Sequence, residues 1–202
     1  MSHILSIEQL VDIYPKPNEK AKNKVLSKLD RHSITMIENS HFCILSSTDD
    51  CGFTDISPKG GSPGFVKVLD QSTILIPDST GNNRIDSLKN IVTNPKVGVM
   101  FMVNGIDEVV RLKGLATIHT DPDLSALCPD GNREPKVIVK VAVESAYFHC
   151  AKAIMRGKLW SNDFQVDRSI LPSLAEIIKE QQKLEGDYVS QEQMMSYYES
   201  SL

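Results

Sequence analysis

Two basic residues lie where an anion could bind. Arg84 follows Asn82 and Asn83 at the start of a predicted helix, in the stretch IPDSTGNNRIDSLKNIVTNP. A helix N-terminus carries roughly half a positive charge, so a cation is unfavourable there unless an anion binds beside it. Lys59 lies in SPKGG, where the glycines would let a ligand approach the backbone closely. These cations and amides would together suit one phosphate group.

Other roles remain open for these cations. Arg84 could be solvated at the surface, or it could form an ion pair with a nearby acid such as Asp78. Isolated basic residues near turns are common. The pattern by itself therefore does not decide among a phosphate site, an ion pair and a solvated side chain.

A short helix would position Arg84. Its predicted apolar face consists of four residues at helical spacing, Ile85, Leu88, Ile91 and Val92. Asn82 or Asn83 would cap the N-terminus, and Pro95 would end the helix after Asn94. This assignment places Arg84 in the first turn.

Strand-like segments surround this helix in the sequence. They are HFCILSS, CGFTDIS, GFVKVLD and TILIP before it, and KVGVMFMV, EVVRLKGLATIHT and KVIVKVAVESAYFHC after it. Gly114 interrupts a clear alternation of apolar and polar residues, which predicts a bulge or a tight barrel corner. About six strands with a helix in the middle indicate a mainly β (α+β) fold, a small antiparallel barrel.

Helices are predicted at both ends of the chain. Residues 5–14 and 19–29 have the composition of short helices, and Asp30 would cap another in DRHSITMIENS. AKAIMRG, after Cys150, and the tail 172–202 are also helix-like. The expected organisation is an N-terminal helical segment 1–29, a β domain 30–165 and a C-terminal helical extension 166–202.

Composition narrows the class of protein. The chain has 202 residues, 41% hydrophobic and 24% charged, which is typical of a globular domain. The formal net charge is -4, and the basic residues are spread along the chain. We therefore expect neither nucleic acid nor a membrane surface as a partner. The four cysteines form no CxxC pair, so we expect reduced thiols, a cytoplasmic protein and no metal site.

Several of these motifs, in this order, resemble a known family. DISPKGGSPGFVKVLD, TILIPDSTGNNRIDSLKNIVTNPKVGVMFMV, RLKGLATI and FHCAKA followed by LW resemble the pyridoxamine 5'-phosphate oxidase-like flavoproteins, which are FMN-binding split-barrel proteins. The resemblance is closest to a bacterial subgroup with SPKG, GNNR-like and FHCAKA signatures. It covers roughly residues 30–165 and leaves the first helices and the C-terminal tail unexplained.

The resemblance implies a split-barrel homodimer with FMN at the subunit interface. It places Ser57, Pro58 and Lys59 along the flavin. It places Ile76 and Pro77 beside the isoalloxazine ring, and Asn82, Asn83 and Arg84 on the phosphate.

The FHCAKA segment is the other candidate region, because in the family it reaches the flavin, often from the partner subunit. His149 and Cys150 are neighbours at a strand end, so only one of them can face a given ligand. Lys152 begins the following helix and again puts a cation at a positive helix end. Trp160 could stack on the flavin edge or be buried in the core or the interface. A packed core or interface role is equally open for His149.

The resemblance carries function only in part. Pyridoxamine phosphate oxidases have a C-terminal Arg-x-His signature that holds the substrate, and the residues after Trp160 lack such a pair. Three hypotheses remain: an FMN-dependent oxidoreductase acting on an unidentified small molecule, a non-catalytic FMN carrier or sensor, and a split-barrel protein for another ligand such as haem or a deazaflavin. Flavin chemistry needs no obligatory side-chain acid or base, so the catalytic residues stay unassigned.

Overall fold

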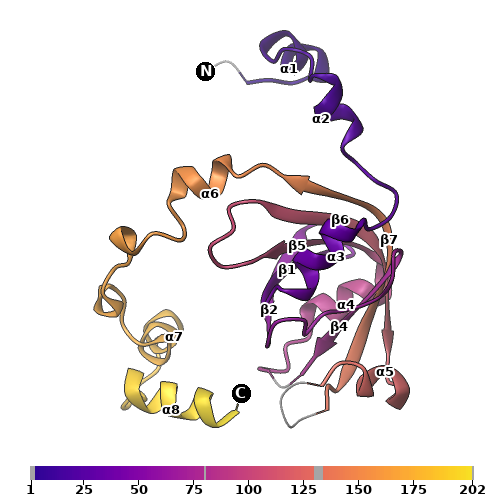
Figure 1. Ribbon diagram of the computed structural model, residues 1–202. Coiled ribbons are helices and arrows are strands. Elements are labelled where there is room, and N and C mark those ends of the chain that lie inside the picture. The colour runs from indigo at the N-terminus through magenta and orange to yellow at the C-terminus, as the bar shows by residue number, and fades with distance from the viewer. Residues whose placement is uncertain (1–2, 80, 130–133, 202) are drawn as a thin grey trace.

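The computed structural model describes residues 3–79, 81–129 and 134–201 (Figure 1). Residues 1, 2 and 202, at the outer ends of the two expected terminal segments, lie outside the described residues. Seven strands form one antiparallel sheet in the order β2-β1-β5-β6-β7-β4-β3. Along the chain, helices precede the first strand and follow the last one. The predicted mainly β (α+β) fold with terminal helices is therefore confirmed.

The strands follow the segments expected from alternation. Their bounds are β1 (Phe42–Thr48), β2 (Thr54–Gly60), β3 (Lys67–Asp70), β4 (Thr73–Asp78), β5 (Lys96–Met102), β6 (Val109–His119) and β7 (Val137–His149). The main helices are α1 (Ile7–Ile13), α2 (Glu19–Asn23), α3 (Arg31–Glu38), α4 (Asp86–Thr93), α5 (Pro122–Ala126), α6 (Lys152–Gly157), α7 (Leu174–Gln182) and α8 (Gln191–Ser201). Helix α5 was not predicted from the sequence.

The sheet curls so that its two ends approach each other. Strand β2 is one edge strand, and β4 lies next to the opposite edge strand β3. A side-chain ion pair nevertheless joins Lys59 of β2 to Asp78 of β4. Pro58 is compatible with this position because an edge strand has unpaired backbone groups and can accept proline. The curvature brings together two segments that are five strands apart in the sheet.

The bulge predicted at Gly114 is confirmed. The pairing of β6 with β7 shifts register between Lys113 and Gly114. A Cβ atom added at Gly114 would lie 2.3 Å from the carbonyl oxygen of Ala142 and 2.7 Å from Val141 Cγ1. Glycine therefore allows the two longest strands to approach closely at the point where the sheet bends.

The core lies inside the curved sheet, where helices α3 and α4 cover it (Figure 1). Helix α3 contributes Met36 and Ile37, and α4 contributes Ile91. The buried amide of Asn90 donates a hydrogen bond of 3.1 Å to Ser47 of β1, which fixes α4 against the sheet. The apolar face predicted for this helix is only partly correct, because Val92 is 77% exposed.

Asp30 caps α3, as the sequence predicted. Its carboxylate accepts a hydrogen bond of 2.8 Å from the backbone N–H of Ser33. Hydrogen bonding to Ser33, first to its side chain and then to its backbone N–H, lowers the pKa of Asp30. A lowered folded-state pKa means that the stabilisation is present above the pKa of the unfolded carboxyl group and is lost as the pH falls through the folded-state pKa.

Asp30→Ala is expected to lower the free energy of unfolding by about 1 kcal/mol, because one N–H at the start of α3 loses its acceptor. Asp30→Asn is the control, since asparagine keeps the acceptor and removes the charge. Urea unfolding at neutral pH and at a pH below the folded-state pKa measures both variants. Equal stability of Asp30→Ala and the unmodified protein at neutral pH would contradict the assigned cap.

The N-terminal segment differs from the prediction after residue 23. A helix was expected over 19–29, but α2 ends at Asn23 and Leu26 forms an isolated antiparallel bridge with Ala146 of β7. Two backbone hydrogen bonds of 2.9 Å make this bridge. The extended pairing to β7 therefore replaces the last two turns of the expected helix.

None of the described helices combines the length and the apolarity that a membrane span requires.

Candidate functional site

A cavity of about 1060 Å³ opens where β2, the end of β4 and the start of α4 meet. It is named here the cation cavity, because Lys59, Arg84 and Lys136 line it. These three cations come from segments far apart in the sequence. The curvature of the sheet and the pairing of β4 with β7 bring them together.

Most of the first group of predicted site residues line this cavity. They are Ser57, Pro58, Lys59, Pro77, Asn82, Asn83 and Arg84. Ile76 does not line it: its side chain is fully buried in the core, so that only the neighbouring Pro77 reaches the cavity wall. The geometry thus brings together residues expected along the flavin and residues expected on its phosphate, while their contact with a ligand stays a prediction.

The start of α4 differs from the prediction. The N-cap is Ile85 rather than Asn82 or Asn83, and Asp86 is the first helical residue. Arg84 therefore precedes the helix and does not occupy its first turn. The first turn carries an acid, as the helix dipole favours. Arg84 seemed unfavourable at the positive end of the helix. The neighbouring carboxylate of Asp86 offsets part of that unfavourable interaction.

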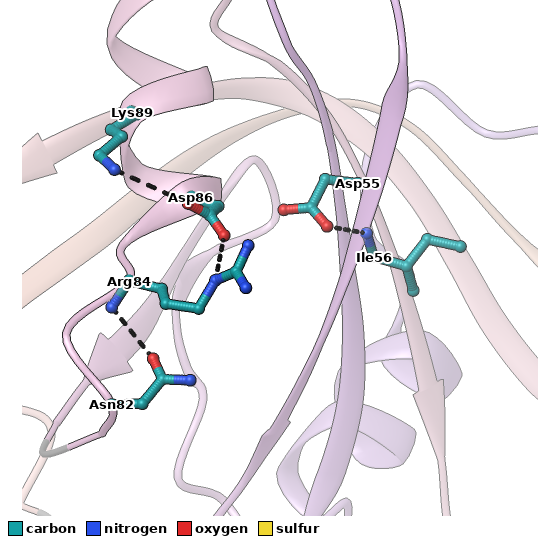
Figure 2. A network of polar contacts seen from close by, with 6 residues as sticks. All are labelled: Asp55, Ile56, Asn82, Arg84, Asp86 and Lys89. Carbon is teal, nitrogen blue, oxygen red and sulfur yellow. Dashed lines mark hydrogen bonds and ion pairs between the residues drawn. The ribbon is translucent and has the colours of Figure 1, made fainter. Parts of the chain in front are cut away.

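Arg84 makes two local contacts (Figure 2). Its Nε lies 2.8 Å from Oδ2 of Asp86, and its backbone N–H donates to Oδ1 of Asn82 at 3.0 Å. The hydrogen bond from Arg84 lowers the pKa of Asp86. Lys89 also approaches Asp86, at 3.7 Å. In Figure 2 the Arg84 side chain extends toward β2, from which the Asp55 carboxylate points back.

The loop before α4 has an unusual backbone. Asn83 has φ 59° and Ile85 has φ 52°, both in the left-handed region. Asparagine tolerates this region, but a β-branched isoleucine is strained there. Ile85 as N-cap also supplies no side-chain acceptor to the first turn of the helix. The loop therefore leaves helix N–H groups uncapped beside the cation cavity, where an anion could accept their hydrogen bonds.

Lys136 is a site residue that the sequence reasoning missed. Its Nζ donates to Oδ1 of Asn83 at 3.2 Å, and its backbone N–H donates to the carbonyl of Asp78 at 3.1 Å. Lys59 and Arg84 each pair with a carboxylate, whereas the partner described for Lys136 is a neutral amide. No local motif could reveal this lysine, because only the pairing of β4 with β7 places it beside the loop.

A buried thiol pairs with a strand that lines the cavity. Cys43 of β1 is directly opposite Lys59 of β2 in the strand register, and its side chain is fully buried. Burial raises the pKa of Cys43 to about 12, although the nearby Lys59 lowers it somewhat. The thiol therefore stays protonated at neutral pH and is not a nucleophile.

The second group of predicted site residues lies elsewhere in the chain. His149 is the last residue of β7, Cys150 is exposed after it, and Lys152 begins α6 as expected. The Nδ1 atom of His149 is buried and has no hydrogen-bond partner among the described residues. None of these residues lines the cation cavity of the same chain.

Trp160 belongs to a different, more apolar cavity of about 480 Å³. Its indole N–H donates a hydrogen bond of 3.0 Å to the carbonyl of Ile106 in the loop between β5 and β6. Phe42, Met102 and Leu159 line the same cavity. Within one chain Trp160 therefore fastens the segment after α6 to the sheet and does not reach the cation cavity.

Comparison with known proteins places this fold in a family. No curated protein sequence matches the chain. Among solved structures, a variant of HupZ from Group A Streptococcus is 20% identical, covers 59% of this chain and 98% of its own, and has a TM-score of 0.50. General Stress Protein 26 from Bacillus anthracis is 16% identical, covers 56% of this chain and 88% of its own, and has a TM-score of 0.44.

The HupZ likeness shows the fold, which is the antiparallel split barrel that the sequence motifs implied. A family model described as pyridoxamine 5'-phosphate oxidase matches residues 29–150, more than half of the 202 residues. The match includes every strand of the sheet and the whole cation cavity. The chain therefore belongs to the pyridoxamine 5'-phosphate oxidase family.

Proposed function

We propose that the chain binds FMN, with the phosphate in the cation cavity. The observation that carries this proposal is the convergence of Lys59, Arg84 and Lys136 on one cavity beside an uncapped helix N-terminus. A phosphate monoester carries nearly two negative charges at neutral pH, which suits several cations and free N–H groups together. The resemblance to FMN-binding proteins of the same family selects this ligand among phosphate esters.

The cavity also fits a ligand of this size. Its volume of about 1060 Å³ lies at the upper end of typical small-molecule sites, so a flavin with its ribityl phosphate can enter. Two of the cations, Lys59 and Arg84, pair with the carboxylates of Asp78 and Asp86. A phosphate would compete with these carboxylates, whereas Lys136 could turn to it by releasing a neutral amide. Lys136 is therefore proposed as a further phosphate contact.

We propose that the bound flavin serves an oxidoreductase acting on a small molecule. The flavin ring can accept and return electrons, and the protein supplies binding, orientation and electrostatics. Ser57 and Pro58 of β2 and Pro77 of β4 line the same cavity and would flank the ring, as the family resemblance implies. The substrate itself is not specified by these residues.

A second function, a non-catalytic FMN carrier or sensor, rests on the same observation. The convergence of Lys59, Arg84 and Lys136 on one cavity accounts for phosphate binding and by itself requires no reaction.

We also propose a homodimer in which the partner completes the flavin site. His149, Cys150, Lys152 and Trp160 lie outside the cation cavity of their own chain. The family relationship suggests that this region reaches the flavin of the partner subunit. The unpartnered Nδ1 of His149 would then have a polar group to bind. The free cysteines are in keeping with a reducing, cytoplasmic location.

Reduction assays separate the two functions. The FMN-loaded protein is mixed with NADH or NADPH, and the flavin absorbance is followed before and after addition of candidate electron acceptors. An oxidoreductase is expected to show repeated cycles of reduction and reoxidation. Tight FMN binding without turnover would favour the carrier or sensor, and failure to bind any flavin would contradict both.

A further inference from the structure

Two terminal segments of the chain bury almost nothing. The N-terminal arm is defined as residues 3–28, and the C-terminal arm as residues 151–200. Every residue of the N-terminal arm is exposed, and Ser173 is the one buried residue among those of the C-terminal arm. Figure 1 shows α1 and α2 standing away from one end of the sheet, and α7 and α8 standing apart from it as well.

The arms nevertheless carry large apolar side chains. Leu5, Ile7 and Val11 of the N-terminal arm are exposed, as are Val166 and Leu171 of the C-terminal arm. The helices of the arms have five to eleven residues, and helices this short are marginal in isolation and depend on packing of an apolar face. A surface that covers these apolar side chains would therefore stabilise the arms.

The accessible surface area of the whole chain shows how much surface a partner could cover. It is 14294 Å² for a chain of 22.4 kDa. A compact monomer of this mass exposes about 9,400 Å², which leaves an excess of roughly 4,900 Å². Obligate homodimers bury about 2,000–5,000 Å² summed over both subunits, so the excess on one chain is more than enough for a dimer interface.

Both arms leave the barrel at the same place. Leu26, near the end of the N-terminal arm, pairs with Ala146 of β7, and the side chain of Lys24 donates to the carbonyl of Phe148 at 3.1 Å. The C-terminal arm starts directly after β7, at residue 151. One partner lying against this end of the barrel could therefore contact both arms.

We propose that both arms pack on a second copy of the chain and clasp its barrel. The barrel offers exposed apolar residues of its own outside the two cavities, including Phe53, Leu69 and Leu115. A two-fold axis would bring the arms of each copy onto such residues of the other. Each contact between an arm and a barrel would then be made twice, once in each direction. The inference rests on the proposed homodimer and assigns its interface to segments outside the family match at 29–150.

Three matched valine substitutions test the clasp in the full-length protein. Val11→Asp and Val166→Asp change arm residues that are 55% and 69% exposed within one chain. Val92→Asp, on α4, changes a valine that is 77% exposed and lies outside the arms. Sedimentation velocity over a dilution series measures the dimer dissociation constant of each variant, and thermal melting measures the stability of the barrel.

Each arm variant is expected to raise the dimer dissociation constant at least about tenfold, because the interface would bury an unpaired carboxylate. Val92→Asp is expected to leave this constant unchanged. Dimers as tight as the unmodified protein in both arm variants, equal weakening by Val92→Asp, or a lost barrel melt in an arm variant would each overturn the clasp. An unmodified protein that stays monomeric would overturn the homodimer together with the clasp.

Discussion

Gly114→Ala is expected to lower the free energy of unfolding by about 3 kcal/mol, the upper range for overpacking a core. The added Cβ would lie 2.3 Å from the Ala142 carbonyl oxygen, a backbone atom that cannot rotate away. The strands β6 and β7 would have to separate at the bulge, where the sheet bends. Urea unfolding of the variant measures the loss.

Gly98→Ala is the matched control, since Gly98 lies in the neighbouring strand β5. A Cβ added there meets its nearest atoms at 3.8 and 3.9 Å, which is ordinary van der Waals contact. We expect its stability to change by no more than about 0.5 kcal/mol. If Gly114→Ala were tolerated as well as Gly98→Ala, the close approach of β6 and β7 would be wrong.

Arg84→Ala is expected to weaken FMN binding by about 1.5–3 kcal/mol, the contribution of a hydrogen bond to a charged group. Riboflavin affinity should not change, because riboflavin lacks the phosphate. The ligand-free protein should keep its stability, since the ion pair of Arg84 with Asp86 is largely exposed and such pairs contribute little. Calorimetric titration with both ligands gives the two affinities.

Lys89→Ala serves as the control for Arg84. Lys89 also approaches Asp86, but it does not line the cation cavity. Its removal should leave FMN affinity unchanged, while Lys136→Ala should weaken FMN in the same direction as Arg84→Ala. Unchanged FMN affinity in Arg84→Ala would show that this arginine is an ordinary surface residue.

The parts of the fold that local patterns encode were predictable. Alternation along 108–120 predicted β6, the glycine within it predicted the bulge, and Asp30 predicted the start of α3. Each of these features depends on residues within a few positions of one another. Their physical causes, side-chain alternation and capping, act over the same short range.

The start of α4 could not be predicted in the same way. Two asparagines are good caps by residue type, yet the chain turns through left-handed Asn83 and Ile85 and begins the helix at Asp86. Contacts beyond the loop accompany this conformation, including the hydrogen bond from Lys136 to Asn83. Residue preferences carry no information on a lysine that lies 53 positions away in the sequence.

The candidate site shows the same division. The motifs around Lys59 and Arg84 pointed to a phosphate, but only the curved sheet shows that the two residues line one cavity with Lys136. Conversely, His149 and Trp160 were grouped with them by resemblance and lie apart in the folded chain. Their distance reflects tertiary arrangement, which sequence spacing does not encode.

Comparison of FMN and riboflavin affinities for the unmodified protein tests the phosphate site most directly. The two ligands share the flavin ring and the ribityl chain and differ only in the phosphate. If the cation cavity holds that phosphate, FMN should bind at least about tenfold more tightly, as even one charge-assisted hydrogen bond provides. Equal affinities, or no binding of either ligand, would contradict the assignment of Lys59, Arg84 and Lys136 to a phosphate.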